Sequence, residues 1–369
     1  MNIWTINLVA AFLISAFLAG ILIPQILLIS FRKKLFDVPD ERKIHKSVVP
    51  RLGGLAFKPV IFITIALIMG VNILLGRKGL LSELSSNDAE IVFVYCSIMV
   101  LYLIGVADDL IGVRYRAKFV AQIICGILII AGGVVFDDFH GILGIYEIPA
   151  FISWPITIFL VVFISNSINL IDGIDGLCSG LCSVALFFYG LMFAMAGEFI
   201  YSLLAFATLG VLVPFFYYNV FGNPEKQSKI FMGDTGSLTI GIIISFLSIR
   251  ISQVPDTMLY YGSNHFVLAF APLIVPCFDV VRVFLHRIRN HKSPFEPDKN
   301  HIHHKLLALG FPQHKAMITI VVTSLLFTFV NFVLSRYINI NILIILNVLI
   351  WTISHIWLTK KIHLVKQKY

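Results

Sequence analysis

The stretch IPAFISWPITIFLVVFISNSINLIDGIDGLCSGLCSVALFFYGLMFAMA, residues 148–196, decides the fold. Two apolar runs within it, 148–166 and 177–196, are each close to the roughly 20 residues that an α-helix needs to cross a membrane. Asn166 and Asn169 fit the inner end of the first run, and Gly173 and Gly176 let the chain leave the helix and present Asp172 and Asp175 from a loop. The stretch therefore predicts two membrane-spanning helices joined by a polar loop.

Composition extends this interpretation to the whole chain. The 369 residues are 58% hydrophobic and 13% charged, with a mean hydropathy of +0.92, far outside the range of soluble domains. We expect an all-α fold, a polytopic membrane helix bundle forming one integral-membrane domain over residues 1–369. Apolar runs of spanning length number eleven, at 3–31, 55–75, 91–107, 119–136, 148–166, 177–196, 199–219, 236–253, 265–286, 315–335 and 340–358.

The distribution of basic residues predicts the orientation of this bundle. With the N-terminus outside and the C-terminus cytoplasmic, the outer side holds only Arg77, Lys78, Arg250 and Arg336 of the 28 Lys and Arg residues. Short cytoplasmic loops of membrane proteins carry an excess of basic residues, so this asymmetry favours the chosen orientation. The net charge of +8 then reflects membrane topology, and we expect no nucleic-acid partner.

The polar motifs gather on the predicted inner side. They are RKIHKSVVPRLGG (42–54), VADDLIGV (106–113), NSINLIDGIDG (166–176), FMGDTGS (231–237) and PDKNHIHHKLLALG (297–310). We expect one cytoplasm-facing site, formed by the loops near 32–54, 106–118, 165–177, 220–237 and 287–314. Ionisable residues this close to hydrocarbon are costly and indicate function.

The acidic motifs suggest a metal. Asp108 and Asp109 are adjacent at the end of the third expected span, so their side chains cannot point the same way on a helix. We expect one to face the bundle interior and the other to pair with a basic neighbour such as Arg116 or Lys118. Asp234 opens the eighth span on the same side. Converging carboxylate and amide oxygens suit a hard cation such as Mg²⁺.

The histidine motif suggests a phosphate site. His301, His303 and His304 lie in a loop that also carries arginines such as Arg282. Zinc is disfavoured, because no cysteine accompanies the histidines and adjacent histidines rarely share one metal. Imidazole and guanidinium groups together fit the recognition of phosphate. A divalent ion and a basic clamp at a membrane surface suit phosphoryl transfer.

These five motifs, in this order between residues 42 and 310, resemble those of the polyprenyl-phosphate N-acetylhexosamine-1-phosphate transferases. The resemblance implies an enzyme that transfers a sugar 1-phosphate from a UDP-N-acetylhexosamine to a lipid phosphate and releases UMP. It implies Mg²⁺ as the cofactor, with Mn²⁺ as a substitute. It also implies a multi-pass protein of the bacterial inner membrane, in contact with membrane lipids; a homodimer is left open.

The HIHH run and the expected span count look like the undecaprenyl-phosphate GlcNAc-1-phosphate transferases, which start O-antigen, common-antigen or teichoic-acid synthesis. The acceptor would then be undecaprenyl phosphate. The alternative within the family is the phospho-MurNAc-pentapeptide transferase of peptidoglycan synthesis. Ile302 counts against it, because that enzyme usually has three consecutive histidines.

The resemblance implies roles for individual residues. Asp234 is the first choice for a Mg²⁺ ligand and Asn169 the second. Asp108 would orient or deprotonate the lipid phosphate, and Asp109 would support it. Asp172 and Asp175 are expected to contact the nucleotide, and Lys46 and Arg51 the lipid phosphate. The residues expected at the diphosphate are His301, His303, His304, Arg282 and Asn166. Of these, His303 and His304 are also expected to be catalytic.

Two alternatives concern mechanism and class. Direct attack of the lipid phosphate on the sugar-bearing phosphorus is favoured over an aspartyl-phosphate intermediate, because a metal and cations can align both substrates. A transporter or lipid flippase is the alternative class, since intramembrane acids also mark ion pathways. Transporters place such acids near the membrane midplane, commonly in repeated halves, whereas this chain keeps them at one face and has no internal repeat.

Overall fold

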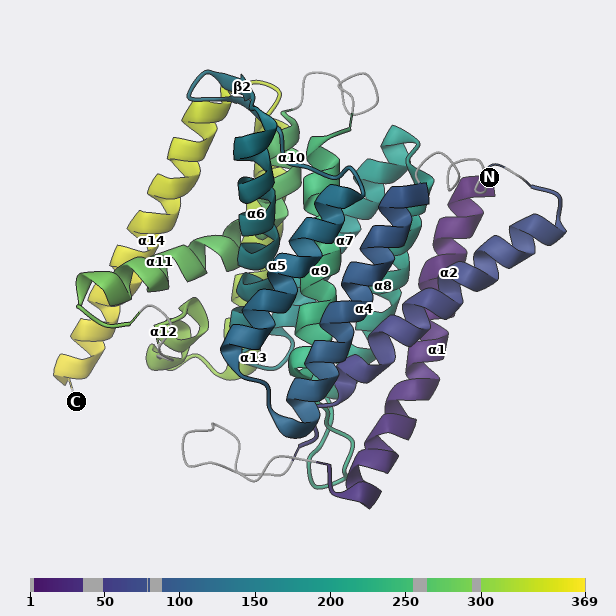
Figure 1. Cartoon of the computed structure of the whole chain (residues 1–369). Coiled ribbons are helices and arrows are strands. Elements are labelled where there is room, and N and C mark those ends of the chain that lie inside the picture. The colour runs from purple at the N-terminus through teal and green to yellow at the C-terminus, as the bar shows by residue number, and fades with distance from the viewer. Residues whose placement is uncertain are drawn as a thin grey trace.

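The computed structural model describes residues 3–35, 49–77, 79, 88–254, 264–293 and 300–368, and they form a helical bundle with one β-hairpin (Figure 1). The elements in chain order are α1 (Ile3–Lys33), η1 (Gly53–Ala56), α2 (Phe57–Leu74), α4 (Asp88–Ile111), α5 (Tyr115–Ala131), β1 (Asp138–Ile142), β2 (Ile145–Glu147), α6 (Ala150–Ile171), α7 (Leu177–Ala196), α8 (Phe199–Val220), α9 (Gly233–Ser252), α10 (His265–Phe270), η2 (Ala271–Leu273), α11 (Ile274–Arg289), α12 (Ile302–Ala308), α13 (Gln313–Leu334) and α14 (Ile340–Lys368). The predicted all-α polytopic bundle is confirmed.

Helix α9 forms the centre of the bundle. Every residue from 235 to 249 is buried, and α9 contacts α4, α6 and α7. Small residues allow these helices to approach closely. A Cβ at Gly105 of α4 would lie 2.4 Å from the Cα of Thr235, and one at Gly241 would lie 2.9 Å from the Cα of Ser165. Gly105 therefore brings the end of α4 against the start of α9, where the acidic motifs lie.

Ten helical segments of the described chain are long and apolar enough to span a membrane, against eleven expected spans. The difference lies at α5, which has 17 residues, or roughly 25 Å of helix. We expected this span at 119–136, but α5 ends at Ala131 because the chain turns at Gly132 and at Gly133, where φ is +91°. The β1–β2 hairpin then follows.

The expected span 265–286 is not one straight helix. It consists of α10 and α11, separated by the 3-10 turn η2, which contains Pro272. Proline lacks a backbone donor and interrupts helical hydrogen bonding. Figure 1 shows α11 lying across the bundle. This break carries α11 sideways toward α12, the helix with the histidine motif.

Candidate active site

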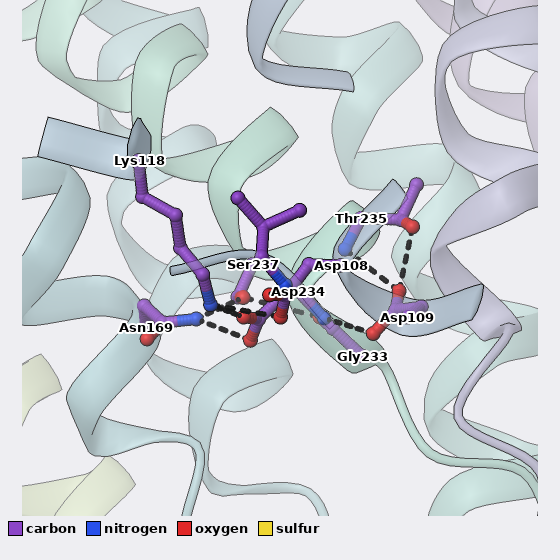
Figure 2. Close-up of polar contacts among 9 residues, drawn as sticks. Asp108, Asp109, Lys118, Asn169, Gly233, Asp234, Thr235 and Ser237 are labelled. Atoms are coloured by element: carbon purple, nitrogen blue, oxygen red, sulfur yellow. Dashed lines mark hydrogen bonds and ion pairs between the residues drawn. The ribbon is translucent and has the colours of Figure 1, made fainter. Parts of the chain in front are cut away.

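Three charged side chains meet at the end of the bundle where α4 finishes and α9 begins, hereafter the motif end (Figure 2). The ammonium of Lys118, on α5, lies 2.8 Å from Asp108 Oδ2 and also pairs with Asp234 Oδ2. Asp108 additionally accepts the backbone N–H of Val113 at 2.7 Å. The predicted pairing of one member of the aspartate pair with a basic neighbour is confirmed, with Lys118 as the partner.

Asp109 points away from this cluster and holds the start of α9. Its carboxylate accepts the backbone N–H groups of Asp234 at 2.8 Å and Thr235 at 2.9 Å, and the Thr235 hydroxyl at 2.6 Å. The first N–H groups of a helix have no partner within it, so a carboxylate there is stabilising. Gly233 has φ +70°, and a Cβ there would meet Asp109 Oδ2 at 2.5 Å. Asp109 thus positions the backbone that presents Asp234.

The two asparagines at the end of α6 have different partners. Asn169 Nδ2 donates to Asp234 Oδ1 and to Ser237 Oγ, each at 2.8 Å, so it joins the acidic cluster. Asn166 Nδ2 instead donates to Gln122 Oε1 on α5 at 2.7 Å. A step of three residues turns a helix by about 300°, which separates the two side chains around α6.

The loop between α6 and α7 presents Asp172 and Asp175, as expected from its glycines. Asp172 follows the last residue of α6, and Gly176 has φ +75° directly before α7. Asp172 is exposed at the motif end. Desolvation, together with the carboxylates of Asp234 and Asp175, raises the pKa of Asp172 to about 7.

Two residues that the sequence did not single out fix this loop. Lys229, which is buried, pairs with Asp175 Oδ2 at 2.5 Å. Asn219, near the end of α8, accepts the backbone N–H of Gly176 at 2.7 Å and donates to the carbonyl of Ile230 at 2.9 Å. The loop after α6 is thereby tied to the segment that leads into GDTGS.

The histidine motif is organised by Asp279 of α11, a third residue that the sequence interpretation missed. Its fully buried carboxylate contacts His301 Nδ1 at 2.8 Å, Arg282 Nη2 at 2.7 Å and the backbone N–H of Ile302 at 3.1 Å. A carboxylate on one imidazole nitrogen fixes the ring and directs the other nitrogen toward a ligand. An acid inside the apolar run 265–286 was the available signal.

His303 joins the histidine motif to the loop after α6. It is 1% exposed, and neither ring nitrogen has a hydrogen-bond partner among the described residues. Burial, and then the neighbouring His304 and His301, lower the pKa of His303 to about 3. A Cβ at Gly173 would lie 2.3 Å from His303 Nε2, so an added methyl group would force the ring or the loop to shift. A phosphate contact by His303 would use a neutral imidazole.

The first motif packs against the fourth. Pro50 accepts the N–H of Phe231 at 2.8 Å, and Gly54 donates to the carbonyl of Met232 at 2.9 Å. A Cβ at Gly54 would lie 2.0 Å from the backbone nitrogen of Gly236, so the glycines of RLGG permit this approach. Arg51, which is exposed, is carried to the motif end. Lys46 lies outside the described residues.

Together these contacts define a polytopic membrane protein with a carboxylate, lysine and amide cluster at one end of its bundle. Residues 91–252 match the model of glycosyl transferase family 4. The chain is 30% identical to the probable undecaprenyl-phosphate N-acetylglucosaminyl 1-phosphate transferase of Bacillus subtilis (strain 168), over 88% of this chain and 84% of that protein.

Two further relatives are undecaprenyl-phosphate alpha-N-acetylglucosaminyl 1-phosphate transferases, from Yersinia pestis and from Escherichia coli (strain K12). Each is 28% identical to this chain, over 82% of this chain and 77% of the relative. The chain therefore belongs to glycosyl transferase family 4. The family resemblance carried by the five motifs is confirmed.

Proposed function

We propose that the protein transfers GlcNAc 1-phosphate from UDP-GlcNAc to undecaprenyl phosphate, giving undecaprenyl-diphosphate-GlcNAc and UMP. The observation that carries this proposal is the convergence of Asp108, Lys118, Asn169 and Asp234 at one end of a membrane bundle. The relatives' names support this reaction over the phospho-MurNAc-pentapeptide and transporter alternatives. The distribution of Lys and Arg supports a cytoplasmic site in the bacterial inner membrane.

The residues of the cluster fit a bound Mg²⁺. The Lys118 ammonium contacts both Asp108 and Asp234, so there is room for a cation between these two carboxylates. No three His, Cys, Asp or Glu side chains of the described residues are grouped to hold a metal. That agrees with Mg²⁺, which commonly takes one or two protein carboxylates and completes its shell with water and substrate phosphates.

In this proposal Asp234 would hold the ion, with the amide oxygen of Asn169 as the second donor, and Asp108 would orient or deprotonate the lipid phosphate. The ion, Mg²⁺ or Mn²⁺, would neutralise charge on the diphosphate when bound. The amide nitrogen of Asn169 orients Asp234. Asp109 keeps the Asp234 backbone in place.

The transfer step of this proposal is an attack of the lipid phosphate on the UDP-sugar. An oxygen of the lipid phosphate attacks the sugar-bearing phosphorus, and the bond from that phosphorus to the UMP oxygen breaks. A phosphate monoester has a second pKa near 6, so much of the acceptor is already dianionic at neutral pH. Arg282 and His301, held by Asp279, bind the diphosphate as UMP departs.

The remaining predicted residues serve recognition. Asp172 and Asp175 bind the nucleotide, and Lys229 holds Asp175 for that purpose. Arg51 and Lys46 meet the lipid phosphate at the membrane surface. The neutral imidazole of His303 packs against Gly173, in the loop that carries Asp172 and Asp175. The ring centroid of His304 lies 4.1 Å from that of His303, so His304 extends the same histidine surface toward the diphosphate.

The direct test is UMP release by the purified protein in nanodiscs with Mg²⁺, undecaprenyl phosphate and a panel of UDP-sugars. Release with UDP-GlcNAc is expected, and release with another UDP-sugar alone would correct the donor. If no UDP-amino sugar supports release, the enzyme proposal is wrong. An acid-stable phosphoenzyme on Asp108 would replace direct attack with the two-step route.

The metal assignment is tested by Asp234→Ala, with Asp88→Ala as the matched control at the opposite end of the bundle. Loss of a charge-stabilising group at a reaction centre typically costs about 10²–10³ in rate. Asp234→Ala should lose this much Mg²⁺-dependent turnover while keeping its elution profile, and Asp88→Ala should stay active. Full activity in Asp234→Ala would refute the ligand assignment.

A further inference from the structure

A groove with an apolar wall and a basic rim opens at the motif end, apart from the candidate active site. It has a volume of about 570 Å³ and lies between the end of α1, the end of α8 and the loop that follows α8. Leu27, Leu28 and Phe31 supply the apolar wall, and Arg32 and Lys226 the basic rim. Figure 1 shows α1 at the edge of the bundle, where membrane lipid would meet it.

The part of this rim that the structure describes is positively charged. Among the described residues that line the groove, Arg32 and Lys226 are the cations and none is acidic. Both side chains are exposed, and the described residues supply no ion pair or hydrogen bond to either. Helix α1 ends at Lys33, so both cations lie where a spanning helix emerges from the membrane. That is the level of lipid headgroups.

We propose that this groove binds an anionic phospholipid. Its phosphodiester lies between Arg32 and Lys226, and one acyl chain runs along Leu27, Leu28 and Phe31. Cations near the headgroups favour negatively charged lipids, and the apolar wall favours a ligand that carries a chain. A free phosphate would meet only the rim. Neither the groove nor the binding test depends on the proposed reaction.

The bound lipid would also hold the segment 222–229, which contacts Asp175 through Lys229. The segment 222–229 closes on itself, because Ser228 Oγ accepts the N–H of Asn223 at 2.9 Å and Ser228 N donates to the carbonyl of Asn223 at 3.1 Å. Lys226 of this segment faces the groove, whereas Lys229 pairs with Asp175. Lipid binding should therefore slow amide exchange of the segment.

The test is native mass spectrometry of the purified full-length protein with phosphatidylglycerol and phosphatidylcholine of matched chains. The wild type should retain phosphatidylglycerol preferentially. Arg32→Ala and Lys226→Ala should each weaken its binding about 5-fold, since one basic residue near a lipid surface contributes about 1 kcal/mol. Lys33→Ala is the matched control, because Lys33 is exposed beside Arg32 but does not line the groove.

A steric pair checks the acyl-chain position without changing charge. Leu28→Trp should block the groove and reduce phosphatidylglycerol retention, whereas Ile29→Trp, on the neighbouring exposed position, should leave retention unchanged. Equal retention in the wild type and in an Arg32→Ala, Lys226→Ala double variant would overturn the proposal, as would an equal loss in Lys33→Ala. Binding of glycerol phosphate as strong as that of the lipid would reassign the groove to free phosphate.

Discussion

Asp109→Asn is the substitution that best separates the two roles of the adjacent aspartates. The Asp109 carboxylate accepts three hydrogen bonds, two from the backbone at the start of α9 and one from the Thr235 hydroxyl. Asparagine replaces one acceptor oxygen by an NH₂ group, so at least one buried N–H loses its acceptor, at about 1–3 kcal/mol. The remaining bonds also lose their charge assistance, so we expect a total of roughly 2–4 kcal/mol.

The assay is thermal unfolding of purified variants in one detergent, followed by size-exclusion chromatography, together with UMP release. Asp109→Asn should lower the apparent Tm by several degrees and reduce turnover only because Asp234 shifts. Thr235→Val, which removes one hydroxyl bond, should cost about 1 kcal/mol.

Asp108→Asn is the matched control in this experiment. Asparagine can still accept the N–H of Val113, and Lys118 keeps Asp234 as its partner, so the apparent Tm should stay near that of the wild type while turnover falls. The reasoning would be refuted if Asp109→Asn were as stable as the wild type, or if Asp108→Asn were the less stable of the two.

Three further predictions follow from single contacts. Lys229→Met should destabilise the protein by about 2 kcal/mol in thermal unfolding, because it leaves the Asp175 carboxylate unpaired. Adding Asp175→Asn to the same chain should restore part of this loss. If the losses of the two single variants simply add in the double variant, the pair does not contribute as described. Gly173→Ala should lower the free energy of unfolding by about 1–3 kcal/mol, because the added methyl group meets His303. Gly70→Ala, which has open space around it, should not destabilise the protein. Equal effects of the two substitutions would contradict the contact. His303 has a pKa of about 3 in the folded protein, against about 6.5 for an unperturbed histidine, so between pH 6.5 and pH 3 only the unfolded chain takes up this proton. Stability should therefore fall by about 1.4 kcal/mol for each pH unit of acidification within that window. The pH slope of the apparent Tm should flatten in His303→Gln, and identical slopes would refute this.

Much of the fold follows from the length and spacing of apolar runs. The glycines of the loop after α6 also predicted where that helix ends, because Asn166 and Asn169 are helical and Asp172 is not. The length of α5 was not predictable from hydropathy, since the apolar run continues to residue 136 while the two glycines end the helix at Ala131. Hydropathy measures burial in lipid and is insensitive to backbone conformation.

The candidate site was predictable as a set of motifs at one end of the bundle, and its long-range pairings were not. Asp279 binds His301 because the break at Pro272 turns α11 toward α12, and a sequence does not give the direction of a break. Lys229 reaches Asp175 from the loop between α8 and α9. Motif order limits which segments can meet, but helix packing decides which side chains do.

The two aspartates of VADDLIGV explain why one short motif can serve two purposes. Consecutive residues on a helix point about 100° apart, so Asp108 reaches Lys118 while Asp109 turns to the first N–H groups of α9. The positive end of α9 stabilises a carboxylate there without any substrate. Asp109 then fixes the backbone at Asp234, and Asp234 and Asp108 share one ammonium. A substitution at Asp109 therefore disturbs the cluster by moving the start of α9, whereas one at Asp108 disturbs it by removing a charge. Only stability measured beside turnover distinguishes these two effects.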